Sequence, residues 1–148
     1  MGLSNNGSGP TTAAIKMVAV TPYLKIEQSH HNVTTRVLLS CASNRITLQA
    51  GIVTTPELSR EKQSSLARNY METDTGEILI AQGSSAVGSV LWLRRTLNDA
   101  DLLSILKTKQ LGIWTENGGP MRWGATIELR TTREKIIYFR NNCLRGAA

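Results

Sequence analysis

The sequence predicts a β-rich α+β fold, with an antiparallel sheet of about six to eight strands and two short helices. Three segments alternate apolar and polar residues with the period of two of a half-buried strand, over 33–41, 45–52 and 121–130. Helix signals are confined to two segments, about 56–70 and 99–111. The composition is rich in Thr, Ser, Asn and Gln, which favour sheet surfaces and turns.

The length of 148 residues is typical of one domain that buries its own core without a metal ion or a disulfide. Turn-forming residues fill positions 1–12 and predict a flexible N-terminal arm, followed by a single β-rich domain over 13–148. The sequence has neither a secretory signal pattern nor an apolar run long enough to cross a membrane, so we expect an intracellular location.

The first third of the chain predicts four strands. Segments 15–20 and 23–27 are separated by a proline, which breaks a strand or introduces a bulge. The two alternating segments that follow are joined by the turn Ala42-Ser43-Asn44, which predicts a hairpin.

The middle of the chain predicts one helix and two strands. Thr55 and Pro56 form a helix start, with a hydroxyl cap and a proline at the first helical position, and they begin the predicted helix over 56–70. A strand is expected over 77–81. The continuously apolar segment 87–93 predicts an interior strand that is covered on both faces.

The strongest helix signal lies over 99–111. Asn98 provides the N-cap, acidic residues follow in the first turn, and Gly112 supplies a stop. The alternating segment 121–130 comes next as a strand, and a turn leads into a last predicted strand over 135–140.

Cys41 and Cys143 are the two cysteines of the chain. Cys41 lies in an apolar strand, where a free buried thiol is the more common state. Pairing requires the fold to bring the two residues together, and their spacing in the sequence leaves that question open.

The net charge of +6 is concentrated towards the two ends of the chain, which are rich in predicted strands. Residues 1–55 carry four basic side chains and one acidic, and residues 121–148 carry six and two. Residues 56–78 carry three basic and five acidic side chains. This distribution favours a polyanionic partner, either nucleic acid or an anionic membrane surface, whereas solubility alone is the simpler alternative.

One triplet in the chain is shared with an enzyme family. Asp74-Thr75-Gly76 matches the active-site loop of retroviral-type aspartic proteases, but Glu72 and Thr73 precede it where those enzymes have apolar strand residues. A catalytic pair of carboxylates needs burial that these flanking residues do not supply. The triplet is also ordinary turn chemistry, which is the interpretation we favour.

Metal and nucleotide motifs are equally weak. His30 and His31 are the only histidines, and adjacent residues of a strand point to opposite faces, so they do not share a metal ion. The glycines are not followed by the lysine or the helix start of a phosphate-binding loop. We therefore predict no catalytic residue, no metal ion and no cofactor.

Basic and polar side chains at the outward positions of the predicted strands indicate a binding surface. If these strands are neighbours, their side chains project from one sheet face, where arginine pairs with phosphate while Thr and Gln bond phosphates, sugars or base edges. The alternative is a solvated face without a ligand. The candidate residues are Arg36, Arg45, Thr47, Gln49, Arg122, Thr126, Arg130, Arg133, Lys135 and Arg140.

Together these patterns favour a non-enzymatic, self-assembling structural protein that binds RNA or another polyanion, such as a small viral coat protein in a homo-oligomer. Phosphate contacts are expected rather than base stacking, because aromatic residues are scarce and the three tryptophans occupy apolar positions. Two alternatives stay open, a matrix-type protein on an anionic membrane and an enzyme whose site is not visible in the sequence. The expected location is the cytoplasm or a virion.

Overall fold

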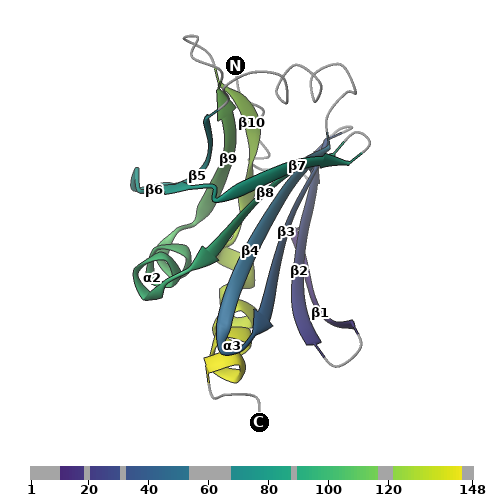
Figure 1. Cartoon of the computed structure of the whole chain (residues 1–148), viewed down its shortest axis with the longest axis vertical. Coiled ribbons are helices and arrows are strands. Elements are labelled where there is room, and N and C mark those ends of the chain that lie inside the picture. The colour runs from purple at the N-terminus through teal and green to yellow at the C-terminus, as the bar shows by residue number, and fades with distance from the viewer. Residues whose placement is uncertain are drawn as a thin grey trace.

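Two antiparallel β-sheets form most of this computed structural model, which describes residues 11–18, 21–30, 33–53, 68–87, 90–116 and 122–144. The six-stranded sheet contains, in order across the sheet, β1 (Thr11–Val18), β2 (Thr21–His30), β3 (Val33–Ala42), β4 (Arg45–Val53), β8 (Val90–Leu97) and β7 (Gly83–Val87). The four-stranded sheet contains β10 (Trp123–Glu128), β9 (Gln110–Glu116), β5 (Arg68–Thr73) and β6 (Ile78–Ile80) (Figure 1).

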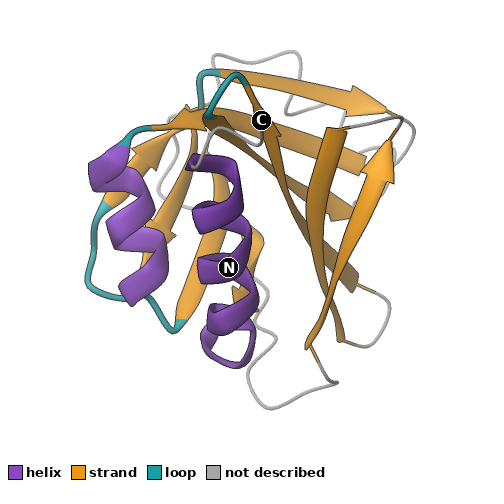
Figure 2. Ribbon diagram, turned by 90° about the horizontal axis from the view of Figure 1, so that it is seen from below, coloured by secondary structure: helices purple, strands orange, loops and turns teal. Residues whose placement is uncertain are grey.

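Two α-helices and one 3₁₀ turn accompany the sheets in the described part of the chain. Helix α2 (Asp99–Lys107) connects β8 to β9, and η1 (Arg130–Thr132) leads from β10 into α3 (Arg133–Leu144). Figure 2 shows the two helices lying side by side at one end of the molecule. Neither of these helices has the length and apolar character that crossing a bilayer requires.

The six-stranded sheet buries one face, because buried and partly exposed side chains alternate along β3 and β4. In the four-stranded sheet Leu111, Ile113 and Ile127 face the core, although the outward residues of β9 are buried as well. The buried faces of both sheets share one hydrophobic core, to which α3 contributes Ile136 and Phe139. The four-stranded sheet covers one end of the buried face of the six-stranded sheet, and the helices cover the other end (Figure 1). The outer faces of the two sheets therefore point away from each other.

The two sheets are connected along both of their sides. On one side β6 continues through Ala81 and Gln82 into β7, so a nearly continuous segment passes from one sheet to the other. On the other side the backbone nitrogen of Glu128 in β10 donates a 3.0 Å hydrogen bond to the side-chain oxygen of Gln28 in β2. These connections fix which faces of the sheets meet in the core.

The predicted β-rich α+β class is confirmed, with ten strands in the described part of the chain that divide between two sheets. The predicted hairpin is β3 and β4. Ser43 and Asn44 take φ values of 53° and 62° in its turn, a left-handed pair that matches the twist of the strands. Strand β1 begins at Thr11, inside the arm predicted over 1–12, and residues 1–10 lie outside the described residues.

Most of the helix predicted over 56–70 also lies outside the described residues. Its last three residues, 68–70, belong to β5, so the prediction is wrong there. Strand β5 pairs with β9 on one side and β6 on the other, and these partners supply the backbone hydrogen bonds that a helix would have made internally. Pairing with these two strands therefore decides the conformation of residues 68–70.

The helix predicted over 99–111 is shorter than expected, because β9 already begins at Gln110. Asp74 ends the helix from a distant turn. Its carboxylate accepts a 3.0 Å hydrogen bond from the backbone nitrogen of Lys109, and its own backbone nitrogen donates to Thr108 Oγ1 at 3.0 Å. The predicted cap is confirmed, since the side chain of Asn98 caps the helix start.

The strand predicted over 135–140 is wrong, because this segment lies in α3. Its β-branched and aromatic residues favoured a strand. The buried residues of α3 instead recur at intervals of three and four, as on one face of a helix, and include Ile136, Phe139 and Cys143. Packing against β2 and β4 therefore outweighs the local preference for a strand.

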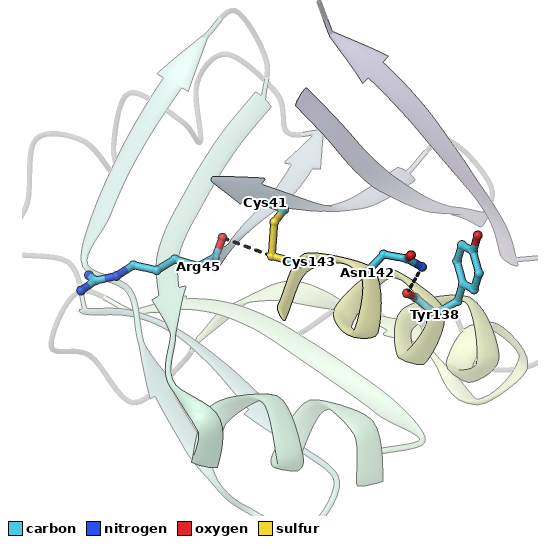
Figure 3. Close-up of a disulfide and its surroundings, with 5 residues drawn as sticks. All are labelled: Cys41, Arg45, Tyr138, Asn142 and Cys143. Carbon is cyan, nitrogen blue, oxygen red and sulfur yellow. Dashed lines mark hydrogen bonds between the residues drawn. A yellow bond between two sulfur atoms is a disulfide. The ribbon is translucent and has the colours of Figure 1, made fainter. Parts of the chain in front are cut away.

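Cys143, near the end of α3, forms a disulfide with Cys41 of β3, with the two Cα atoms 5.7 Å apart (Figure 3). The free thiol expected at Cys41 is therefore wrong. The helix is the reason, since it carries Cys143 back to the β3–β4 hairpin, where its Sγ lies 3.8 Å from the carbonyl oxygen of Arg45. The bond joins residues 102 positions apart.

Candidate functional site

The outer face of the six-stranded sheet is strongly basic. Among the side chains that the structure describes, this face carries Lys25, Arg36, Arg45 and Arg94 against the single carboxylate of Glu27, an excess of three positive charges. They project from β2, β3, β4 and β8, which are consecutive strands of the sheet. We call this surface the basic face.

Glu27 neutralises only part of the basic face. Its carboxylate accepts a short hydrogen bond from Nε of Arg36 across the strand pair, and it lies 3.4 Å from Nζ of Lys25. Partial burial raises the pKa of Glu27, but the hydrogen bonds and charges of Arg36 and Lys25 outweigh it and lower the pKa below its usual value. Arg45 and Arg94 form no ion pair with any described side chain.

Uncharged polar groups lie between the cations of the basic face. Thr47 and Thr96 face each other across β4 and β8, with their hydroxyl oxygens 3.5 Å apart. Gln49 is directly opposite Arg94 in the same strand pair. These hydroxyl and amide groups can hydrogen-bond phosphates, sugars or base edges beside a charged contact.

Two glycines make the basic face flat along β8. A Cβ atom at Gly51 would lie 2.6 Å from Cζ3 of Trp92, and one at Gly83 would lie 3.0 Å from Nη2 of Arg94. The indole ring of Trp92 therefore lies across β4, and the guanidinium of Arg94 lies across β7. Neither large side chain could lie so close to the sheet over a residue with a side chain of its own.

Four of the sequence-predicted binding residues meet on the basic face, namely Arg36, Arg45, Thr47 and Gln49. Lys25, Trp92 and Arg94 were missed. The run 87–93 was expected to be covered on both faces, but Trp92 is partly exposed between the buried Leu91 and Leu93. The sequence offered no clear signal for Trp92 and Arg94, because residues 90–93 are all apolar and two arginines follow without alternation.

Arg122 and Thr126 lie on the outer face of the four-stranded sheet, away from the basic face. The guanidinium of Arg122 stacks 3.9 Å above the ring of Trp114 and donates to Glu72 at 2.7 Å and to Tyr70 at 3.3 Å. Burial lowers the pKa of Arg122, but the bonds to Tyr70 and Glu72 outweigh it and raise the pKa. Arg122 is therefore committed to contacts within the fold.

The remaining predicted residues are in η1 and α3. Arg130 lies 3.9 Å from the carboxylate of its neighbour Glu128, and the ammonium of Lys135 donates to the backbone oxygen of Ala13 at 2.7 Å. The last two, Arg133 and Arg140, lie in α3. The ten predicted residues thus divide among the two sheets and the C-terminal helical segment. The reasons are that β10 belongs to the four-stranded sheet and that residues 135–140 form part of a helix.

The acidic turn at 74–76 has a structural role. The Asp74 carboxylate binds the end of α2, and Gly76 has a φ of 89°, a conformation that favours glycine. Among the described residues, no three His, Cys, Asp or Glu side chains gather in an arrangement that could hold a metal ion. The backbone of His30 ends β2, whereas His31 lies outside the described residues.

A hollow of about 380 Å³ lies between the two helices and is lined by Asp99, Leu102, Leu103, Arg140 and Asn141. It is an open feature of the helical surface with one acidic and one basic side chain. The basic face is the larger and more strongly charged candidate.

Comparison with known proteins adds no further information on the site, since no family model, curated protein or solved structure matches this chain.

Proposed function

We propose that this protein is a non-enzymatic nucleic-acid-binding protein that contacts its ligand through the basic face. The observation that carries the proposal is the excess of positive charge on four adjacent strands, where Arg45 and Arg94 have no carboxylate partner among the described side chains. Arginines held on neighbouring strands can neutralise several phosphates at once without a large loss of side-chain freedom.

The proposal includes self-assembly of the coat-protein type, with RNA against the basic face of each copy. Strand β6 supports it, because this strand forms an edge of its sheet and leaves Ile78 and Ile80 partly exposed. A particle also gives the Cys41–Cys143 disulfide a suitable environment, since disulfides persist on virion surfaces. The proposed location is therefore the cytoplasm during assembly and a virion afterwards.

Charge reversal tests the binding face. We expect Arg45→Glu with Arg94→Glu to weaken binding of a fluorescently labelled single-stranded RNA by about tenfold or more. The plot of log affinity against log salt concentration should become shallower by about 1.4, because two phosphate contacts are lost. Fluorescence anisotropy over a series of salt concentrations measures both quantities.

Arg130→Glu with Arg133→Glu is the matched control, because it makes the same change in net charge away from the basic face. An equal loss of affinity in both double variants would show that only the total charge matters and would remove the basic face as the site. Binding of wild-type protein to phosphatidylserine vesicles but not to RNA would replace the proposal by the matrix-type alternative.

A further inference from the structure

Trp92 lies on the basic face, whereas the other two tryptophans belong to the four-stranded sheet. Its neighbours Leu91 and Leu93 are buried in the core, so its own side chain points outward. Three ring atoms lie between 2.6 and 2.9 Å from the place where a Cβ atom of Gly51 would be. The indole therefore lies parallel to the sheet, with one ring face against the backbone and the other directed outward.

The surroundings of Trp92 are polar and cationic. Gly51 separates it from Arg36, which is the register partner of Gly51 in β3. Arg94 lies two residues further along β8 on the same face, with Gln49 opposite it. A partly exposed aromatic ring is thus flanked by two guanidinium groups and an amide, which are the groups that bind phosphates and base edges.

The other two tryptophans have different environments. Trp114 is only 6% exposed, and the guanidinium of Arg122 covers its ring. Trp123 packs against the hydrophobic core from the inner face of its sheet. In the part of the chain that the structure describes, no guanidinium stacks on Trp92.

We infer that the nucleic acid bound by this protein is single-stranded and that one of its bases stacks on the outward ring face of Trp92. The inference rests on the proposed function and specifies its ligand. It departs from the expectation of phosphate contacts without base stacking, because Trp92 lies on the outer face of the sheet and not in an apolar interior. The bases of a duplex stack on each other and do not present a free face, whereas an unpaired base can lie flat on an aromatic ring at a sheet surface. Arg94 would then contact a phosphate beside that base, and Arg36 would contact another through the guanidinium nitrogens that do not bond Glu27.

The first test compares three proteins with a labelled single-stranded RNA and with the duplex of the same sequence. Wild-type protein should bind the single strand at least about tenfold more tightly than the duplex. Trp92→Leu should lose about tenfold in affinity for the single strand, whereas Trp92→Phe keeps an aromatic ring and should lose less than about threefold. Equal affinity of the wild type for single strand and duplex would overturn the inference.

A second measurement does not depend on how well Trp92→Leu folds. Addition of unlabelled single-stranded RNA should quench the intrinsic tryptophan fluorescence of the wild type, because stacking places a base against the indole. The quenching should disappear in Trp92→Phe, which retains Trp114 and Trp123. Quenching that persists in Trp92→Phe would show that the base lies elsewhere.

The two proposals can fail separately. If Trp92→Leu binds single-stranded RNA as the wild type does while Arg45→Glu with Arg94→Glu does not, stacking is excluded and the basic face remains the binding site. If both variants bind as the wild type does, the basic face and the stacking site are rejected together.

Discussion

Arg94 and Arg122 illustrate how neighbouring groups decide what an arginine can do. Arg122 is held by Trp114 and Glu72, so its charge is balanced within the fold. Arg94 extends over Gly83 on an open sheet face and forms no ion pair with a described side chain. An unpaired arginine such as Arg94 can bind an external anion without first breaking an ion pair.

Glu27 is the residue whose contribution to stability should depend on pH. We expect Glu27→Gln to lower the free energy of unfolding by about 0.5 kcal/mol at pH 7, a small effect because the Arg36 side chain is 37% exposed and solvent screens the pair. Folding lowers the pKa of Glu27, so its stabilising effect is complete above the ordinary value of 4.5 and is lost as the pH falls through the folded value.

Urea unfolding of wild type and Glu27→Gln at pH 7 and pH 2.5 measures this effect. The difference between the two proteins should be present at pH 7 and absent at pH 2.5. Glu134→Gln serves as the control, since Glu134 is exposed on α3. A difference of the same size at both pH values would contradict the role of the carboxylate charge.

A disulfide joins the end of helix α3 to β3. Reduction should lower the free energy of unfolding by about 2–4 kcal/mol, because the bond closes a loop of 102 residues and restricts the unfolded chain. Urea unfolding with and without dithiothreitol gives the difference. Cys41→Ser with Cys143→Ser should match the reduced wild type and should not respond to the reductant.

An unchanged urea midpoint on reduction would contradict this expectation. It would mean that the packing of Ile136 and Phe139 already holds α3 in place and that the bond adds no constraint. The circular dichroism of the reduced protein separates local loss of the helix from destabilisation of the entire fold.

The contrast between the β3–β4 hairpin and the two helices shows which parts of the fold could be predicted from the sequence. The hairpin was predicted because its alternation and its Ser43-Asn44 turn are local signals. The end of α2 was not predicted correctly, because Asp74 caps it from a turn that is distant in the sequence. The helix over 133–144 packs against β2 and β4, contacts that lie far away in the sequence, whereas local preferences in 135–140 pointed to a strand.

The candidate site was predictable to the extent that it lies on that hairpin. Arg36, Arg45, Thr47 and Gln49 share a face because β3 and β4 are neighbours both in sequence and in the sheet. Arg94 joins them through the pairing of β8 with β4, which no local pattern specifies. Arg122 was assigned to the same face because the sequence did not show that its strand belongs to a second sheet.

The molecule as a whole has two outer faces of different character, one cationic and one whose arginines are paired. We expect wild-type protein to elute in size-exclusion chromatography as a multi-copy particle that absorbs at 260 nm. The basic faces of many copies would together neutralise the phosphates of one RNA. Light scattering before and after nuclease treatment measures the change in mass. Arg45→Glu with Arg94→Glu should elute at a smaller mass and without nucleic acid.

A wild-type protein that elutes as a monomer with no absorbance from nucleic acid would contradict the coat-type proposal. Particles whose mass is unchanged by nuclease and that carry no nucleic acid would show that contacts between copies suffice for assembly. In that case the basic face would have no part in the particle.

The Cys41–Cys143 bond turns most of the polypeptide into a covalent ring. Strands β4 to β10 all lie within it, so a protease that cuts once between those strands opens the ring without releasing a fragment. Nicked chains of this protein therefore keep both pieces until a reductant separates them.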